Sequence, residues 1–145
     1  MKNLITVLVC LFISQFTFAQ CDQKSVLNFN QVTESRDNDA GKPMKLGGTI
    51  SMDKEEINIT IVLNGRENKI YSKIKPESGC AWETFLKTGK GQYHVSSRKG
   101  EKGPEDNAKI TLETLKGSTK LTFKSDAENA SALVFDVIET NFSKQ

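Results

Sequence analysis

The fold is decided by residues 57–70, which read Ile-Asn-Ile-Thr-Ile-Val-Leu-Asn-Gly-Arg-Glu-Asn-Lys-Ile. Isoleucine alternates with polar residues over the first five positions, a pattern typical of a strand with one buried face. Asn64-Gly65 then favours a two-residue type I′ turn, because both residues tolerate positive φ. Such a turn places Ile59 opposite Ile70 and brings the apolar residues of both strands onto one face. The stretch therefore predicts a β-hairpin of defined register.

The same period of two recurs on both sides of this hairpin, with turn-forming sequences between the repeats. The further alternating stretches are Met44–Met52, Gln92–Arg98, Ala108–Leu112, Leu121–Phe123 and Leu133–Val137. The predicted turns and loops are Lys75–Gly79, Gly89–Gly91, Lys99–Asn107, Lys116–Ser118 and Ser125–Ala130. Residues 23–35 fit either a short helix or an edge strand.

The last strand carries apolar residues on both faces, which predicts that it is covered on both sides or lies across a barrel seam. We therefore expect an all-β fold. It would be an antiparallel meander of eight or nine short strands, closed into a small barrel or packed as a β-sandwich, with at most one short N-terminal helix.

Residues 1–19 have the features of a cleavable signal peptide. Lys2 is followed by an apolar run from Leu4 to Ile13, which is too short to span a bilayer. Small residues at positions 17 and 19 predict cleavage between Ala19 and Gln20. The alternative is a buried N-terminal apolar helix. Removal of 19 of the 145 residues leaves a single exported domain at 20–145, periplasmic or secreted, and changes the formal net charge from +2 to +1.

Cys21 and Cys80 remain after cleavage, and an even pair in an oxidising compartment favours a disulfide. Closure of a loop of this length contributes roughly 3–4 kcal/mol in the chain-entropy model. Two alternatives stay open: lipidation of Cys21 at a lipoprotein-type cleavage site, which would anchor the protein to a membrane, or two free thiols. Two cysteines and one histidine supply too few ligands for a zinc site, so no metal is expected.

Composition excludes several function classes. A near-neutral chain gives no general argument for nucleic acid or for an anionic membrane, and we expect neither a nucleic-acid partner nor a transmembrane segment after residue 20. No cofactor fingerprint occurs. The size is that of small ligand-binding barrels such as lipocalins and avidin-like proteins, but their N-terminal Gly-x-Trp motif is missing, and Gly79-Cys80-Ala81-Trp82 lies in mid-chain.

Few residues are candidates for chemistry. His94 is the only histidine and has no neighbouring triad partners, so we expect a solvent-facing strand residue. Asp37-x-Asp39-x-Gly41 resembles the start of a calcium loop but lacks its later ligands. Asp136 lies between apolar residues, and burial there would require a partner such as a salt bridge.

Aromatic and basic residues are the candidates for ligand or partner binding, because rings offer large contact areas and cations attract anionic groups. The aromatic candidates are Trp82, Tyr71 and Tyr93, with core packing as the alternative role. The basic candidates come from a cluster over residues 87–102 and are Arg98, Lys99 and Lys102, with a solvated loop as the alternative.

Four functions are compatible with these residues. The first is a non-enzymatic exported binding protein that engages a protein partner, in an inhibitor or immunity-like role. The second is a lipocalin-like carrier of a small apolar ligand inside a barrel. A structural envelope protein is the third. An enzyme is the last, and only a carboxylate-based hydrolase fits the composition.

Overall fold

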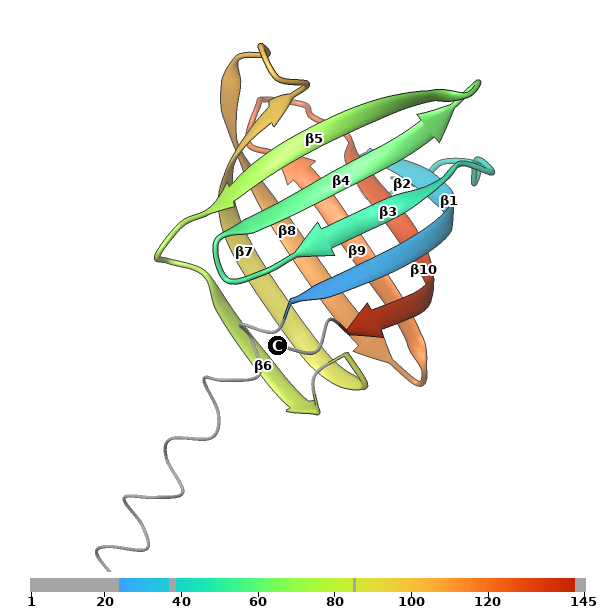
Figure 1. The fold of residues 1–145 in the computed structure, drawn as a ribbon, viewed down its shortest axis with the longest axis vertical. Coiled ribbons are helices and arrows are strands. Elements are labelled where there is room, and N and C mark those ends of the chain that lie inside the picture. Colours follow the sequence, from blue (N-terminus) through green and yellow to red (C-terminus); the bar gives the residue numbers. More distant parts are fainter. Residues whose placement is uncertain (1–23, 37–38, 85, 143–145) are drawn as a thin grey trace, which may run out of the picture.

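The structure, a computed structural model, describes residues 24–36, 39–84 and 86–142 (Figure 1). These residues form ten strands and no helix. The strands are β1 (Ser25–Arg36), β2 (Asp39–Ala40), β3 (Gly47–Met52), β4 (Glu56–Leu63), β5 (Arg66–Ile74), β6 (Gly79–Thr84), β7 (Thr88–Lys99), β8 (Glu105–Leu115), β9 (Ser118–Ser125) and β10 (Ala132–Phe142). The described part has no helix long and apolar enough to cross a bilayer.

Eight strands close into a barrel. Their spatial order is β1, β3, β4, β5, β7, β8, β9 and β10, and β10 pairs back onto β1. All pairings are antiparallel, so the barrel is a meander in which successive long strands are neighbours. In Figure 1, β3 to β5 cross in front of β7 to β9. The expected all-β meander is confirmed, as a barrel and not as a sandwich.

The predicted hairpin at 57–70 is present with the predicted register. Leu63 pairs with Arg66 and Ile59 pairs with Ile70. Asn64 and Gly65 have φ values of 52° and 75°, the left-handed geometry that a type I′ turn requires. Ile57 and Ile59 are fully buried. The apolar face of this hairpin therefore lies inside the barrel.

The N-terminal segment differs from both expectations for residues 23–35. β1 is a strand of 12 residues, neither a helix nor an edge. β10 pairs along one side of it, and β3 and β2 pair along the other. Barrel closure gives β1 a partner on each side, which local sequence could not reveal. Of the two alternatives predicted for the last strand, coverage on both faces or a position at a barrel seam, the β1–β10 pairing shows the seam.

The predicted turn at Gly89–Gly91 is wrong, because both glycines lie within β7. The chain instead reverses between β6, which ends at Thr84, and β7, which begins at Thr88. Packing explains Gly91: a Cβ there would come within 2.7 Å of the Tyr93 hydroxyl oxygen. This glycine makes room for a ring and does not bend the chain.

Two other predicted connections differ from the structure, one in direction and one in length. The segment at 75–79 does not reverse the chain, because β5 and β6 pair one after the other along the same edge of β7. The loop predicted at 99–107 is shorter, since β8 already begins at Glu105.

Large apolar side chains fill the barrel interior. The rings of Phe29 on β1 and Phe135 on β10 meet edge to face across the seam, with centroids 4.9 Å apart. Phe135 is fully buried. Gly48 on β3 provides space for the Phe29 ring, because a Cβ there would lie 2.6 Å from Phe29 Cζ and would overlap the Thr60 carbonyl oxygen. The seam therefore closes around an aromatic pair that needs this glycine.

The predicted signal peptide, its cleavage site and Cys21 lie outside the described residues. Asp37 of the calcium-loop resemblance does so as well. These predictions therefore stay predictions. Cys80 is half-buried on β6.

Candidate functional site

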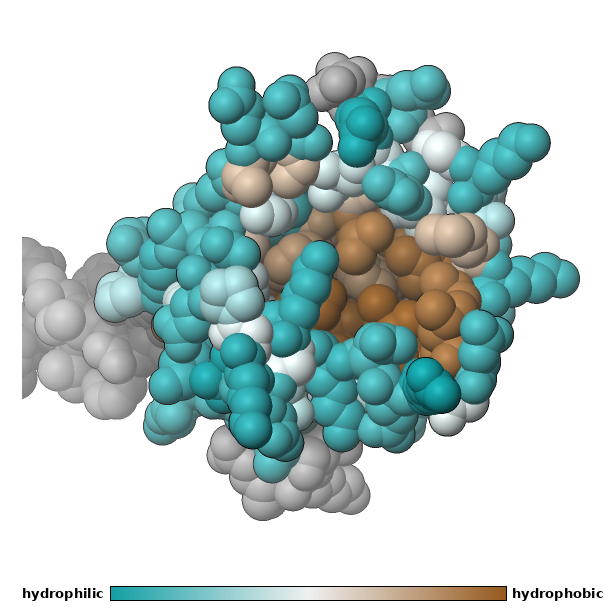
Figure 2. Space-filling model, turned by 90° about the horizontal axis from the view of Figure 1, so that it is seen from above, coloured by the Kyte–Doolittle hydropathy of each residue, from teal (hydrophilic) through white to brown (hydrophobic). Residues whose placement is uncertain are grey.

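The two ends of the barrel differ. One end, called the mouth here, carries the β4–β5 turn, the β7–β8 loop and the β9–β10 loop. The β3–β4 and β8–β9 turns lie at the opposite end. Seen from above, the mouth has apolar side chains in a hollow surrounded by hydrophilic residues (Figure 2).

The inward face of β4 shows how the interior opens. Ile57 and Ile59 are fully buried, Ile61 is half-buried and Leu63 is 46% exposed. All four belong to the same alternating face, so exposure rises steadily from the filled core to the mouth. The core packing that closes the lower barrel therefore stops short of the mouth and leaves apolar wall uncovered.

A cavity of about 500 Å³ lies at this end. Its apolar walls come from three strands: Ile70 on β5, Phe123 on β9 and Leu133 on β10. Pro104 and two alanines of the β9–β10 loop, Ala127 and Ala130, add to the rim. The volume falls within the roughly 300–1,000 Å³ of small-molecule sites.

Polar groups surround the apolar part of this cavity. Ser97 lies inside the wall and donates its hydroxyl to the Asp106 carbonyl oxygen at 3.2 Å. Glu34 and Asp106 contribute carboxylates, and Lys99 contributes an ammonium group. The cavity is thus mainly apolar with a few charged groups at the rim, an arrangement that holds the apolar part of a ligand inside and its polar part near water.

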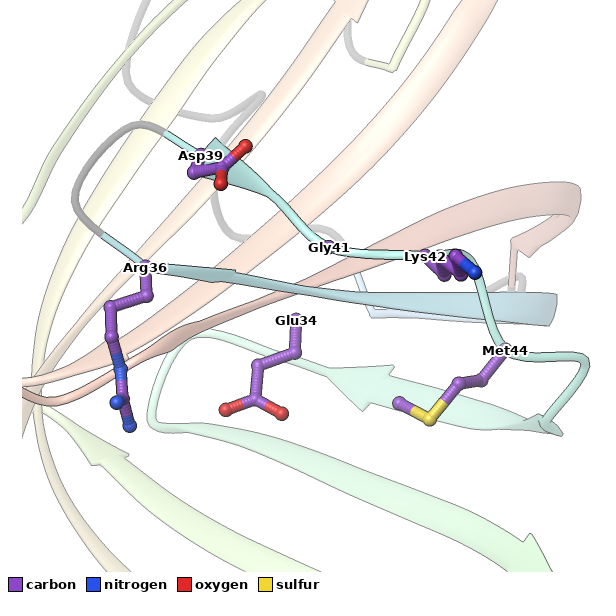
Figure 3. Close-up of a pocket in the computed structure, with 6 residues that line it drawn as sticks. All are labelled: Glu34, Arg36, Asp39, Gly41, Lys42 and Met44. Carbon is purple, nitrogen blue, oxygen red and sulfur yellow. The ribbon is translucent and has the colours of Figure 1, made fainter.

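A second hollow of about 530 Å³ adjoins the first and shares Glu34 with it. Its lining residues are Glu34, Arg36, Asp39, Gly41, Lys42 and Met44. Figure 3 shows Glu34, Arg36 and Met44 extending to the same side of β1 and the segment after it, whereas Asp39 points away. Arg36 Nε donates to Ser131 Oγ at 3.3 Å, a contact that joins β1 to the start of β10. This hollow is a groove that extends the mouth.

The residues predicted to bind a ligand or partner do not form one site. Arg98 and Lys99 line the mouth cavity. Tyr71 lies on the outer face, where the Arg98 guanidinium carbon is 5.6 Å from its ring centroid. Lys102 is exposed on the β7–β8 loop and does not line the cavity.

Two predicted aromatic candidates belong to the core. Tyr93 is 4% exposed inside the barrel. Trp82 on β6 is half-buried and packs against the core cluster. The packing role that the sequence allowed for them is the role seen here.

Several other polar residues are placed as expected. His94 is exposed on β7. Asp136 accepts a hydrogen bond from Gln31 Nε2 at 2.8 Å and lies 3.4 Å from Lys120 Nζ, which supplies the predicted salt bridge. Within the described ranges, no group of three or more His, Cys, Asp or Glu side chains could hold a metal ion.

An ion pair on the outer face of β5 changes the pKa of Lys69. Lys69 Nζ lies 3.0 Å from a Glu67 carboxylate oxygen. That hydrogen bond, supported by the charge of Glu67, raises the pKa of Lys69 above its usual value. The pair lies on exposed positions of β5 and takes no part in the cavity.

Sequence reasoning did not single out the apolar cavity residues Ile70, Phe123 and Leu133. Each of these residues lies on the inward face of its strand, near the end that points to the mouth, and the alternating pattern shows the inward face. To recognise that the three share one cavity requires the order of the strands in the barrel and the direction of each strand, which the pattern of a single strand does not give.

No family model matches the chain. Neither the curated proteins nor the solved structures include a match to it. The geometry of the mouth is therefore the basis for a functional proposal.

Proposed function

We propose that the protein binds one small, mainly apolar molecule in the mouth cavity and acts as a carrier. The single observation that supports this most strongly is the 500 Å³ cavity with apolar walls from β5, β9 and β10. An apolar ligand there would cover surface that is otherwise exposed to water, at roughly 25 cal/mol per Å². This is the second function compatible with the sequence, and the cavity makes it better supported than the first.

A protein partner remains the alternative prediction. The basic residues that motivated it are dispersed: Arg98 and Lys99 line the cavity, and Lys102 lies on the loop above it. The cavity suits a small molecule better than such a dispersed set suits a protein.

Adjacent residues on β10 provide a matched test. Leu133 lines the cavity, whereas Val134, its neighbour in the chain, is equally half-buried and belongs to the opposite face. A titration with the apolar fluorescent dye N-phenylnaphthylamine measures binding. We expect Leu133→Lys to weaken dye binding by tenfold or more, on the order of the 1.4 kcal/mol that a tenfold change represents, and Val134→Lys to leave it unchanged.

Two results would contradict the proposal. One is saturable dye binding that both variants weaken equally, since the dye would then bind outside the mouth. The other is no dye or lipid binding by a folded wild-type protein.

Export and the disulfide are part of the same proposal. The proposed disulfide joins Cys21 to Cys80 of β6. The start of β1 and strand β6 both lie toward the end opposite the mouth. Cys21 precedes Ser25, the first residue of β1, by four residues, a span of at most about 14 Å. Mass spectrometry of the protein from its host, before and after reduction and alkylation, tests this. A mature start at Gln20 with two thiols alkylated only after reduction supports it, whereas an acylated Cys21 would indicate a lipid anchor.

A further inference from the structure

The exposed apolar side chains are concentrated at the mouth. Five large apolar residues of the described chain are strongly exposed, and three of them, Met44, Val62 and Leu63, lie at this end with exposures of 43%, 44% and 46%. The other two, Leu115 and Ile138, lie apart from it. This distribution separates the mouth from the rest of the barrel surface.

Two segments carry these side chains, and the sheet places them side by side. The first is residues 42–46, Lys-Pro-Met-Lys-Leu, and the second is residues 62–66, Val-Leu-Asn-Gly-Arg. Gly47, directly after the first segment, pairs with Val62 of the second. We call the two segments together the lip.

All the charged side chains of the lip are cations. Its charged residues are Lys42, Lys45 and Arg66, all exposed, and it contains no carboxylate. The nearest carboxylate along the chain, Glu67, is paired with Lys69 at 3.0 Å. Glu34 and Asp39 line the adjoining groove together with Arg36, and Lys42 and Met44 of the lip line the same groove. The lip itself therefore combines exposed aliphatic side chains with an excess of positive charge.

We propose that the lip docks the barrel mouth onto an anionic lipid surface. Aliphatic side chains gain by leaving water for the headgroup and acyl boundary, and lysine and arginine are attracted to anionic headgroups, each by about 1 kcal/mol near the surface. A protein interface would favour aromatic residues and disfavour lysine. The lip has two lysines and no aromatic residue, so its chemistry favours a lipid surface over a protein.

Docking in this orientation also gives the carrier a source of ligand. The mouth cavity would face the bilayer, and an apolar molecule could pass between membrane and cavity without crossing bulk water. This consequence rests on the proposed function, whereas docking itself does not.

Vesicle flotation tests the docking, with vesicles of phosphatidylglycerol and phosphatidylcholine in equal parts and vesicles of phosphatidylcholine alone. We expect the protein to bind the anionic vesicles and to be released by high salt. Lys42→Ser with Lys45→Ser is expected to lower the partition coefficient roughly 25-fold, at about fivefold per cation. Val62→Ser is expected to lower it further. None of these residues lines the mouth cavity, and of the three only Lys42 lines the adjoining groove.

The opposite end supplies a matched control hairpin. Leu115-Lys116-Gly117 forms a turn with φ values of 52° and 79° at Lys116 and Gly117, close to those of Asn64 and Gly65. Its leucine is 62% exposed. Leu115→Ser with Lys116→Ser is expected to leave vesicle binding unchanged.

Three outcomes would overturn the docking proposal: no binding to anionic vesicles, equal binding to both vesicle types, or equal loss in the control variant. Capture of an acidic protein without vesicle binding would assign the lip to a protein partner and would also overturn it. Dye titration of the same variants separates the two proposals. A variant that loses vesicle binding but keeps dye binding reports on the docking proposal alone. A variant that loses dye binding but keeps vesicle binding reports on the cavity alone.

Discussion

Phe135→Ala tests whether the barrel is closed through the β1–β10 seam. Phe135 is fully buried, and its ring meets Phe29 edge to face at 4.9 Å. Truncation of a fully buried phenylalanine costs about 3–5 kcal/mol. A domain of this size is stable by roughly 5–15 kcal/mol, so the variant would lose a large share of its stability and its Tm would fall by on the order of 15 °C.

Urea denaturation followed by circular dichroism measures this loss. Ile138→Ala is the control on the same strand, because Ile138 is 61% exposed, and its expected effect is within about 0.5 kcal/mol. A double-mutant cycle with Phe29→Ala isolates the contact across the seam, with an expected coupling of about 0.5–1.5 kcal/mol. A loss below about 1 kcal/mol for Phe135→Ala, or no coupling to Phe29, would refute closure around this pair.

Three further predictions concern β3, the β4–β5 turn and the outer face of β5. Gly48→Ala is expected to destabilise the protein by about 1–3 kcal/mol through overpacking, measured by thermal unfolding, whereas Gly79→Ala should be close to neutral because a Cβ at position 79 would have no neighbouring atom within 4 Å. Gly65→Ala is expected to cost about 1 kcal/mol, since φ is 75° there; an unchanged urea midpoint would contradict the turn assignment. Glu67→Gln is expected to lower the pKa of Lys69 toward 10.5 in an NMR titration. Because the folded pKa is raised, the pair stabilises the fold fully below the unfolded pKa and loses this contribution as pH rises through the folded value, and an unshifted Lys69 would contradict the pairing.

Local sequence was sufficient for the hairpin at 57–70. Alternation determines the buried face, and Asn64-Gly65 determines the turn, so the pairing of Ile59 with Ile70 follows from adjacent residues alone. The salt bridge of Asp136 was predictable for a similar reason, because a carboxylate between apolar residues needs a partner. The identity of that partner as Lys120 was not, since it depends on the β9–β10 register.

Long-range contacts account for what the sequence did not predict. β1 fitted a helix or an edge strand because its partner β10 lies at the far end of the chain and gives no local signal. Gly91 was interpreted as a turn residue because the sequence does not show that the Tyr93 ring needs its space. Phe123 and Leu133 pair directly across the β9–β10 hairpin, but only the closed barrel brings this hairpin close to Ile70 on β5, so local sequence does not reveal the cavity.

The most direct test of the central claim is the position of a bound ligand. Isotope-filtered NOE spectroscopy with unlabelled N-phenylnaphthylamine and methyl-labelled protein reports which side chains the ligand contacts. Binding in the mouth predicts NOEs from the dye to the Leu133 and Ile70 methyl groups and none to Leu112, which is fully buried in the core. NOEs that instead involve Leu115 or Ile138 on the outer surface would contradict the account.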